Sequence, residues 1–168
     1  EAAGQAANIG TDTHQAIHAF LRDGKAETSR LPQAAQWAEL AFEDWWSQSG
    51  LRAVRMEIPI WSLEHRYACT PDIIAEDPER GLGIAEVKSS KGIYDNYHLQ
   101  VMGQVIAARN WGDIRWAKII RVPKHLDDPA FEIKDLGDLY DRKLSWEQLE
   151  HAFLAIVQAW HILKMEQP

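Results

Sequence analysis

A short turn between two strand-like segments constrains the fold of this chain more than any other feature. Residues 65 to 75 and residues 82 to 88 both read as β-strands, and the segment EDPERG, Glu76 to Gly81, joins them. Its Asp-Pro pair and its final Gly are typical of turns. The sequence therefore predicts an antiparallel hairpin.

Two carboxylates are predicted to meet across this hairpin. Asp72 and Glu86 are each seven residues from Glu79, near the middle of the turn. Directly opposed residues of an antiparallel pair have Cβ atoms roughly 4.5 to 5.5 Å apart. Like charges this close raise each other's pKa unless a cation lies between them. Because converging oxygen ligands suit Mg²⁺ or Mn²⁺, the pair indicates a metal site.

Lys88 completes the pattern, since it lies two residues past Glu86 and strand periodicity places both on one face. A lysine beside a metal can orient the attacking water or offset negative charge that gathers at a phosphorus atom. The alternative is a weak ion pair on a solvated strand face. The flanking sequence IAEVK favours a buried strand and hence the catalytic interpretation.

The remaining pattern predicts an α/β or α+β domain, with a central mixed β-sheet flanked by helices. Helices are expected at residues 11–22, 33–48 and 95–109 and after Ser145, and further strands at 53–61, 115–122 and 130–136. Gly24 and Gly50 are expected to end the first two helices. No repeat or linker is visible, so residues 1–168 are expected to form one domain.

Two helices carry an apolar stripe at helical spacing. In the second helix the stripe predicted to face inward is Trp37, Leu40, Ala41 and Trp45. In the last helix, Ser145 and Gln148 form a capping box. The face of that helix predicted to be apolar consists of Leu149, Ala152, Phe153, Ile156, Trp160 and Leu163.

Composition excludes several classes of protein. Of the 168 residues, 46% are hydrophobic and 26% charged, as in globular proteins, and no apolar run is long enough to span a membrane. The single Cys69 excludes a disulfide framework and a four-cysteine iron–sulfur cluster within the chain and suits a reducing cytoplasm. The net charge of -7 argues against a broad basic DNA-binding face. The chain starts at Glu1 without a leader, so an N-terminal segment is expected to be missing.

Together these residues resemble a family, the PD-(D/E)XK nucleases. Its pattern is matched by Pro71-Asp72 and by Glu86-Val87-Lys88. An upstream Gly-x-x-x-His, here Gly10 to His14, resembles the motif that precedes the hairpin in the RecB-like exonuclease branch. That branch also has Gln-x-x-x-Tyr after the Lys strand, and this chain has Gln100 followed by Gln104 in place of the tyrosine. Without cluster cysteines, it looks more like the phage-type and mitochondrial genome-maintenance exonucleases.

The resemblance implies a restriction-endonuclease-like core and one or two Mg²⁺ or Mn²⁺ ions. His14, Asp72, Glu86 and the carbonyl of Val87 would hold a metal, Lys88 would act on the attacking water, and Gln100 would orient the site. The implied activity is a DNA exonuclease that leaves 5′-phosphates and works with recombination or repair proteins, in a bacterial or phage-infected cell. Alternatives are an endonuclease, a nuclease module of a helicase-linked complex, or a non-catalytic nucleic-acid-binding module.

Several further residues carry two interpretations. Glu57 could bind a second metal or pair with Lys88, or be a solvated strand residue. Tyr97 could partly replace the missing tyrosine. His18 is expected to be a surface or packing histidine, because HQAIH has Gln15 where a zinc protease needs Glu. Phosphate contacts are candidates at Lys91, Lys118, Arg121 and Lys124, although such residues are more often solubilising charges. Most tryptophans are expected in the core rather than stacked on bases.

Overall fold

A computed structural model describes residues 2–123, 127 and 131–165. The helices are α1 (Ala2–Asp23), α2 (Gln33–Ser49), α3 (Asp95–Ala108) and α4 (Trp146–Met165). The strands are β1 (Arg52–Met56), β2 (Ile60–Ser62), β3 (Tyr67–Cys69), β4 (Ile73–Asp77), β5 (Gly81–Ser89), β6 (Trp116–Val122) and β7 (Glu132–Asp135).

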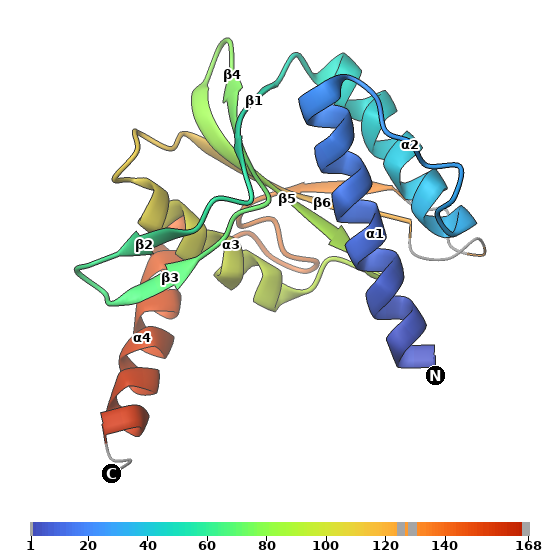
Figure 1. Ribbon diagram of the computed structural model, residues 1–168. Helices are drawn as coiled ribbons and strands as arrows, with labels where there is room; N and C mark the ends of the chain where they lie inside the picture. The colour runs from blue at the N-terminus through green and yellow to red at the C-terminus, as the bar shows by residue number, and fades with distance from the viewer. Residues whose placement is uncertain (1, 124–126, 128–130, 166–168) are drawn as a thin grey trace.

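Five strands form a mixed sheet in the order β1-β4-β5-β6-β7, and β2 pairs with β3 in a separate small sheet. Only the β5–β6 pairing of the large sheet is parallel. The helices α1 and α2 lie on one side of the large sheet, and α3 and α4 lie on the other (Figure 1). The predicted α+β class, a mixed sheet flanked by helices, is confirmed.

Two apolar cores follow from the alternation of side chains along β5. Ile84 packs in the core beneath α3 and α4, whereas Ala85 and Val87 pack in the core beneath α1 and α2. Both faces of β5 are therefore covered, as its continuous apolar run predicts. Glu86 shares the parity of Ile84 and points toward α3.

The predicted hairpin is confirmed, and local chemistry explains its turn. Asp77 Oδ1 accepts hydrogen bonds from the backbone N–H groups of Glu79 and Arg80, at 2.9 and 3.0 Å. The Arg80 guanidinium and these N–H groups hold the pKa of the Asp77 carboxyl below its usual value. Gly81 has a φ of 88°, which favours glycine. The turn therefore sets a register in which Ile73 pairs with Ala85.

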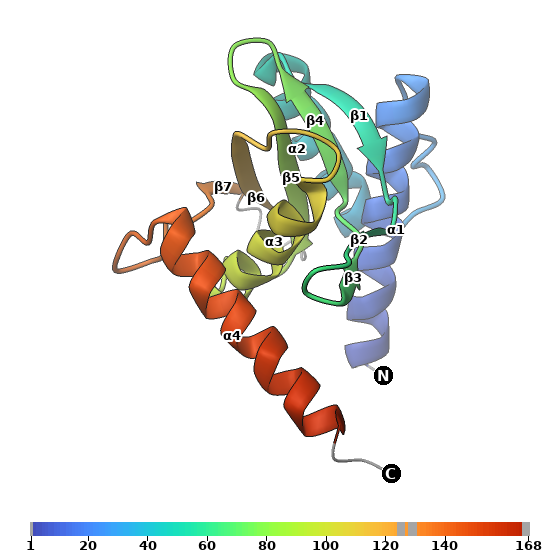
Figure 2. The same ribbon diagram turned by 90° about the vertical axis from the view of Figure 1, so that its left-hand side faces the viewer.

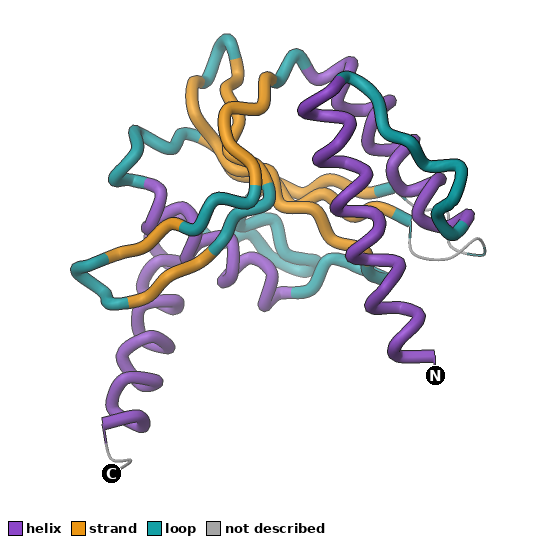
Figure 3. The backbone as a smooth tube through the Cα atoms, in the orientation of Figure 1, coloured by secondary structure: helices purple, strands orange, loops and turns teal. Residues whose placement is uncertain are grey.

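The predicted strands at 53–61 and 65–75 are each divided in two. Glu57, with a φ of 47°, interrupts the first between β1 and β2. The second divides near Pro71, between β3 and β4. Proline has no N–H to donate to a ladder, and Pro59 and Pro71 lie at the two divisions. The two connecting segments run side by side (Figure 3), joined by a 3.1 Å hydrogen bond from the N–H of Glu57 to the carbonyl of Asp72.

Helix α1 is longer than expected. It begins at Ala2 rather than near residue 11, so His14 lies inside the helix and does not open it. It ends where predicted, at Gly24, whose φ is 73°. His14 lies on α1 and Asp72 directly precedes β4, so the packing of α1 on the sheet decides whether these two predicted ligands meet.

The inner face predicted for α2 is wrong, although its bounds are right. Trp37 and Leu40 are 43% and 61% exposed. The buried face instead includes Ala35, Ala38, Phe42 and Trp46. Small alanines let α2 approach its neighbours closely, while Trp46 stacks on Phe42 with ring centroids 5.5 Å apart. Trp45 stays half-buried, so the two adjacent tryptophans face different surroundings, as expected.

Helix α4 starts with the predicted capping box, since the N–H of Ser145 donates to Gln148 Oε1 and the N–H of Gln148 donates to Ser145 Oγ. Leu149 is buried, but Ile156, Trp160 and Leu163 are exposed. The predicted continuous apolar face is therefore only partly buried, because the second half of α4 extends away from the sheet (Figure 2).

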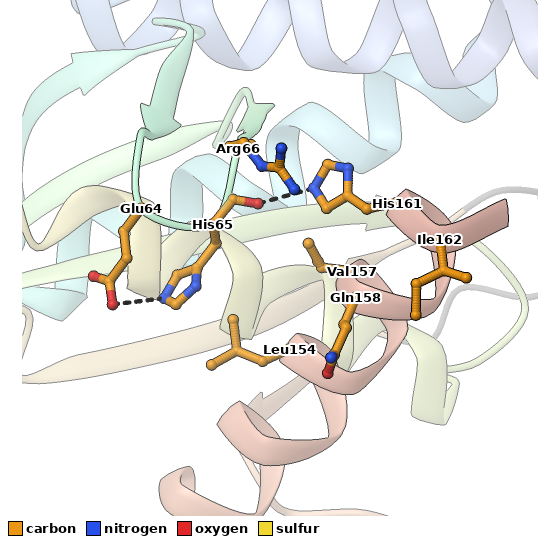
Figure 4. A pocket seen from close by; sticks show the side chains of 8 residues that line it. All are labelled: Glu64, His65, Arg66, Leu154, Val157, Gln158, His161 and Ile162. Carbon is orange, nitrogen blue, oxygen red and sulfur yellow. Dashed lines mark hydrogen bonds and ion pairs between the residues drawn. The ribbon is translucent and has the colours of Figure 1, made fainter. Parts of the chain in front are cut away.

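A shallow pocket lies between α4 and the β2–β3 hairpin. The His161 ring approaches the carbonyl of His65 at 3.0 Å across it (Figure 4). This pocket is separate from the predicted metal residues.

None of the helices in the described residues combines the length and the hydrophobicity that a membrane span requires.

Candidate active site

The hairpin brings Asp72 and Glu86 together as predicted. Asp72 directly precedes β4, and continuing the β4–β5 register places it opposite Glu86. Its backbone N–H donates to Glu86 Oε2 at 3.3 Å, and its own Oδ2 accepts the N–H of Val87 at 2.8 Å. The two carboxylates are therefore anchored on opposing strands, each by the other strand's backbone.

Lys88 lies on the same face as Glu86, which confirms the prediction from strand periodicity. Its Nζ is 2.8 Å from Glu86 Oε1. Glu86 is only 2% exposed, and burial together with the charge of Asp72 raises the pKa of its carboxyl, against the opposing effect of Lys88. A positive charge added beside two such carboxylates would strongly stabilise the ionised form of the buried one.

Helix α3 supplies two amides to the same carboxylate. Gln100 Nε2 donates to Glu86 Oε1 and Gln104 Nε2 donates to Glu86 Oε2, both at 2.9 Å. Gln100 Oε1 also accepts a hydrogen bond from Lys88 at 3.0 Å. Tyr97 lies one turn earlier, with its ring centroid 5.1 Å from Lys88 Nζ. Each oxygen of Glu86 therefore has two donors.

Gln104 is the residue of the candidate site whose role could not be predicted from the sequence. It replaces the tyrosine expected from the family resemblance, yet it is 1% exposed and directly bonded to Glu86. Its four-residue spacing from Gln100 is the sequence signal for a shared helix face. Only the packing of α3 against β5 shows that this face meets Glu86.

Helix α1 brings His14 to the other side of the site. His14 Nδ1 is 3.4 Å from Asp72 Oδ1. Burial lowers the pKa of the imidazole, but the hydrogen bond with Asp72 and the charges of Asp72 and Glu86 outweigh it and leave a net rise. The predicted convergence of His14 with the hairpin carboxylates is therefore present.

The donor set fits a divalent cation. It combines two carboxylates, one of them buried, with an imidazole nitrogen, and such mixed oxygen and nitrogen sets suit Mg²⁺, Mn²⁺ and related ions. The excess negative charge of Asp72 and Glu86 also favours a cation. The carbonyl of Val87 lies between Glu86 and Lys88 in the chain, and its role as a ligand stays a prediction.

Glu57 does not contact Lys88 as one interpretation proposed. The predicted strand 53–61 included it, but it lies just past the end of β1. Its Oε2 is 3.3 Å from His18 Nδ1. His18 is 8% exposed, so it is not a surface residue. Burial lowers the pKa of its imidazole, opposed by the charge of Glu57. The spacing of His14 and His18 in the sequence signals that both lie on one helix face.

The residues predicted to contact phosphate differ in their exposure and in their partners. Arg121 is buried, and its Nε donates to the carbonyl of Ser90 at 2.7 Å, so its proposed surface role is not supported. Lys118 is partly buried and paired with Asp135 at 2.5 Å. Lys91 is exposed. Lys124 lies outside the described residues.

Comparisons with known proteins do not assign a family or a function to this chain. No protein-family model matches the chain, and no curated protein matches it. Among solved structures, a chain of a cryo-EM structure of a DrdV–DNA complex is similar with 20% identity and a TM-score of 0.25. The match covers 86% of this chain and 13% of that chain. A likeness this weak carries no argument about function.

Proposed function

We propose that this protein is a divalent-metal-dependent nuclease that hydrolyses DNA phosphodiester bonds, and specifically an exonuclease. The observation that carries the proposal is the assembly of Asp72, Glu86 and Lys88 at the end of one hairpin, with His14 and Gln100 reaching it from two helices. The resemblance of these same residues to the RecB-like branch of the PD-(D/E)XK nucleases supports the chemistry and the choice of DNA ends.

The family resemblance and the observed contacts together assign each residue a role. His14, Asp72, Glu86 and the carbonyl of Val87 would hold Mg²⁺ or Mn²⁺, which would supply Lewis-acid stabilisation of charge on the phosphate oxygens. Lys88 Nζ is held by Glu86 and Gln100, and it would orient the attacking water and offset charge that builds up on the phosphate. Gln100 thus positions both the lysine and the carboxylate.

The burial of Glu86 separates this site from an ordinary surface ion pair. The chain holds a second Glu-x-Lys, in β7, where Lys134 Nζ is 3.6 Å from Glu132 Oε1. The side chain of Glu132 is 40% exposed, whereas that of Glu86 is 2% exposed. The β7 pair therefore serves as a matched control with the same spacing and ordinary solvation.

The decisive experiment incubates end-labelled single- and double-stranded DNA, linear and circular, with Mg²⁺, with Mn²⁺ and with EDTA. We expect cleavage of linear DNA only with metal. Lys88→Met and Glu86→Gln should each lower the rate by at least about 100-fold, the usual scale for losing transition-state charge stabilisation. Lys134→Met and Glu132→Gln should leave it within about twofold.

The outcomes separate the alternatives. Cleavage in EDTA, or full activity of Lys88→Met, would contradict the metal-dependent mechanism. Digestion of circular DNA would replace the exonuclease with an endonuclease while keeping the chemistry. DNA binding without cleavage under every metal condition would favour the non-catalytic module.

A further inference from the structure

A second set of potential ligands lies beside the candidate active site. The nearest ligand atoms of His14, His18 and Glu57 all lie within 4.8 Å of one another. Of the three, only His14 belongs to the proposed nuclease site. Two imidazoles and one carboxylate make a different donor set from the carboxylate pair on the hairpin.

The spacing already approaches that of a metal site. Ligands bonded at about 2.0 to 2.1 Å to a tetrahedral zinc ion are roughly 3.4 Å apart. His18 Nδ1 and Glu57 Oε2 are 3.3 Å apart. His14 and His18, four residues apart on α1, present their rings to the same side with centroids 6.2 Å apart. Binding would therefore require only side-chain adjustment.

The burial of His18 agrees with its predicted packing role, and one of its ring nitrogens also faces the ligand group. Its ring is buried, yet its Nε2 has no hydrogen-bond partner among the described residues. The polar contact of this ring, through Nδ1, points to Glu57 and hence into the ligand group.

The group is also open to solvent. A surface pocket lined by Gly10, Thr11, His14, Gln15 and Glu57 leads to it. The side chain of Glu57 is 57% exposed, while its backbone N–H is held by the carbonyl of Asp72 at 3.1 Å. An ion can therefore reach His14 and Glu57 from solvent, and Glu57 Oε2 lies 3.3 Å from the buried His18 Nδ1.

We propose that His14, His18 and Glu57 bind a transition-metal ion of the zinc class, with water as a further ligand. Imidazole-rich sets favour Zn²⁺, Co²⁺ and related ions over Mg²⁺, which prefers oxygen ligands. The site would tie α1 to the segment between β1 and β2. His14 would be shared with the proposed nuclease site, so the two ions would compete for it, whereas His18 and Glu57 have no role in the proposed cleavage.

Cobalt titration tests the site directly, because Co²⁺ bound in place of zinc is followed by visible absorbance. The titration uses the Glu86→Gln background, which weakens binding at the hairpin. We expect one Co²⁺ per chain, displaced by Zn²⁺ and not by millimolar Mg²⁺. Adding His18→Gln or Glu57→Gln should weaken binding at least about tenfold, by loss of one ligand.

Matched variants make the result decisive. His65→Gln removes a histidine that forms another His–Glu pair, with Glu64 at 3.9 Å, and should leave Co²⁺ affinity unchanged. Glu57 is exposed, so Glu57→Gln tests the site even if His18→Gln does not fold. Undiminished Co²⁺ affinity in Glu57→Gln would overturn the proposal. Because the readout is metal binding, a failed nuclease assay leaves it intact.

Discussion

At the scale of single residues, the hydrogen bonds to Glu86 orient its carboxylate and stabilise its charge. Under the proposed function Gln104 would be a positioning residue, because it contacts Glu86 rather than substrate. Replacing it with Leu removes one donor to a charged group, worth about 1.5 to 3 kcal/mol. We expect Gln104→Leu to lower the cleavage rate about 10- to 100-fold and to raise the Mn²⁺ concentration at half-maximal rate.

The control for that variant is Gln158→Leu, on an exposed position of α4. It should change neither the rate nor the Mn²⁺ dependence. If Gln104→Leu loses stability but retains the wild-type Mn²⁺ dependence, Gln104 is only a packing residue.

Glu39 on α2 leads to a prediction about pH. It is 4% exposed, and burial together with the charge of Glu43 raises the pKa of its carboxyl to about 7. A carboxyl with a raised pKa in the folded state stabilises the fold below its unfolded pKa of 4.5, and this stability is lost as the pH rises through about 7. Glu39→Gln should therefore have a higher urea midpoint than wild type at pH 8, and its free energy of unfolding should be larger by up to about 3 kcal/mol. At pH 4.5 the two proteins should unfold at the same urea concentration.

The comparison variant is Asp44→Asn, which removes the same charge from an exposed position of α2. It should show no such pH-dependent gain. An equal gain for Glu39→Gln at both pH values would show that the effect comes from packing rather than from ionisation.

At the scale of elements, the contact of α3 with α4 depends on one glycine. A Cβ added at Gly103 would lie 2.5 Å from Cζ of Phe153, which is too close. Overpacking of this kind typically costs about 1 to 3 kcal/mol. Gly103→Ala should therefore lower the urea midpoint, whereas Gly92→Ala, with no atom within 4 Å of the new Cβ, should not. Equal midpoints for the two variants would mean that Phe153 moves aside freely.

At the scale of the whole molecule, the charge of -7 would make a bound cation important for the proposed contact with DNA. Lys118 is already paired with Asp135, and Arg121 is buried. Divalent ions invert the local charge of a carboxylate site. With the inactive variant Lys88→Met, fluorescence anisotropy should show at least about tenfold weaker binding of an oligonucleotide in EDTA than in Mg²⁺. Equal affinity in both conditions would place the DNA contacts away from the carboxylates.

Much of the fold and the centre of the site could be predicted from local patterns. The turn chemistry of Asp77 and Gly81 set the hairpin register, and that register put Asp72 opposite Glu86. Period-2 alternation put Lys88 on the face of Glu86, and the capping box marked the start of α4. These features depend on residues that are close in sequence or joined by one short turn.

What the sequence by itself determined was therefore the hairpin, its opposed carboxylates and its lysine. Only the tertiary structure decided that Gln104 bonds to Glu86, that Glu57 turns to His18, and that the second half of α4 leaves the core. The physical reason is that strand and helix periods fix which residues share a face. The distance between two faces is set by how whole elements pack, and contacts from the entire chain contribute to that packing.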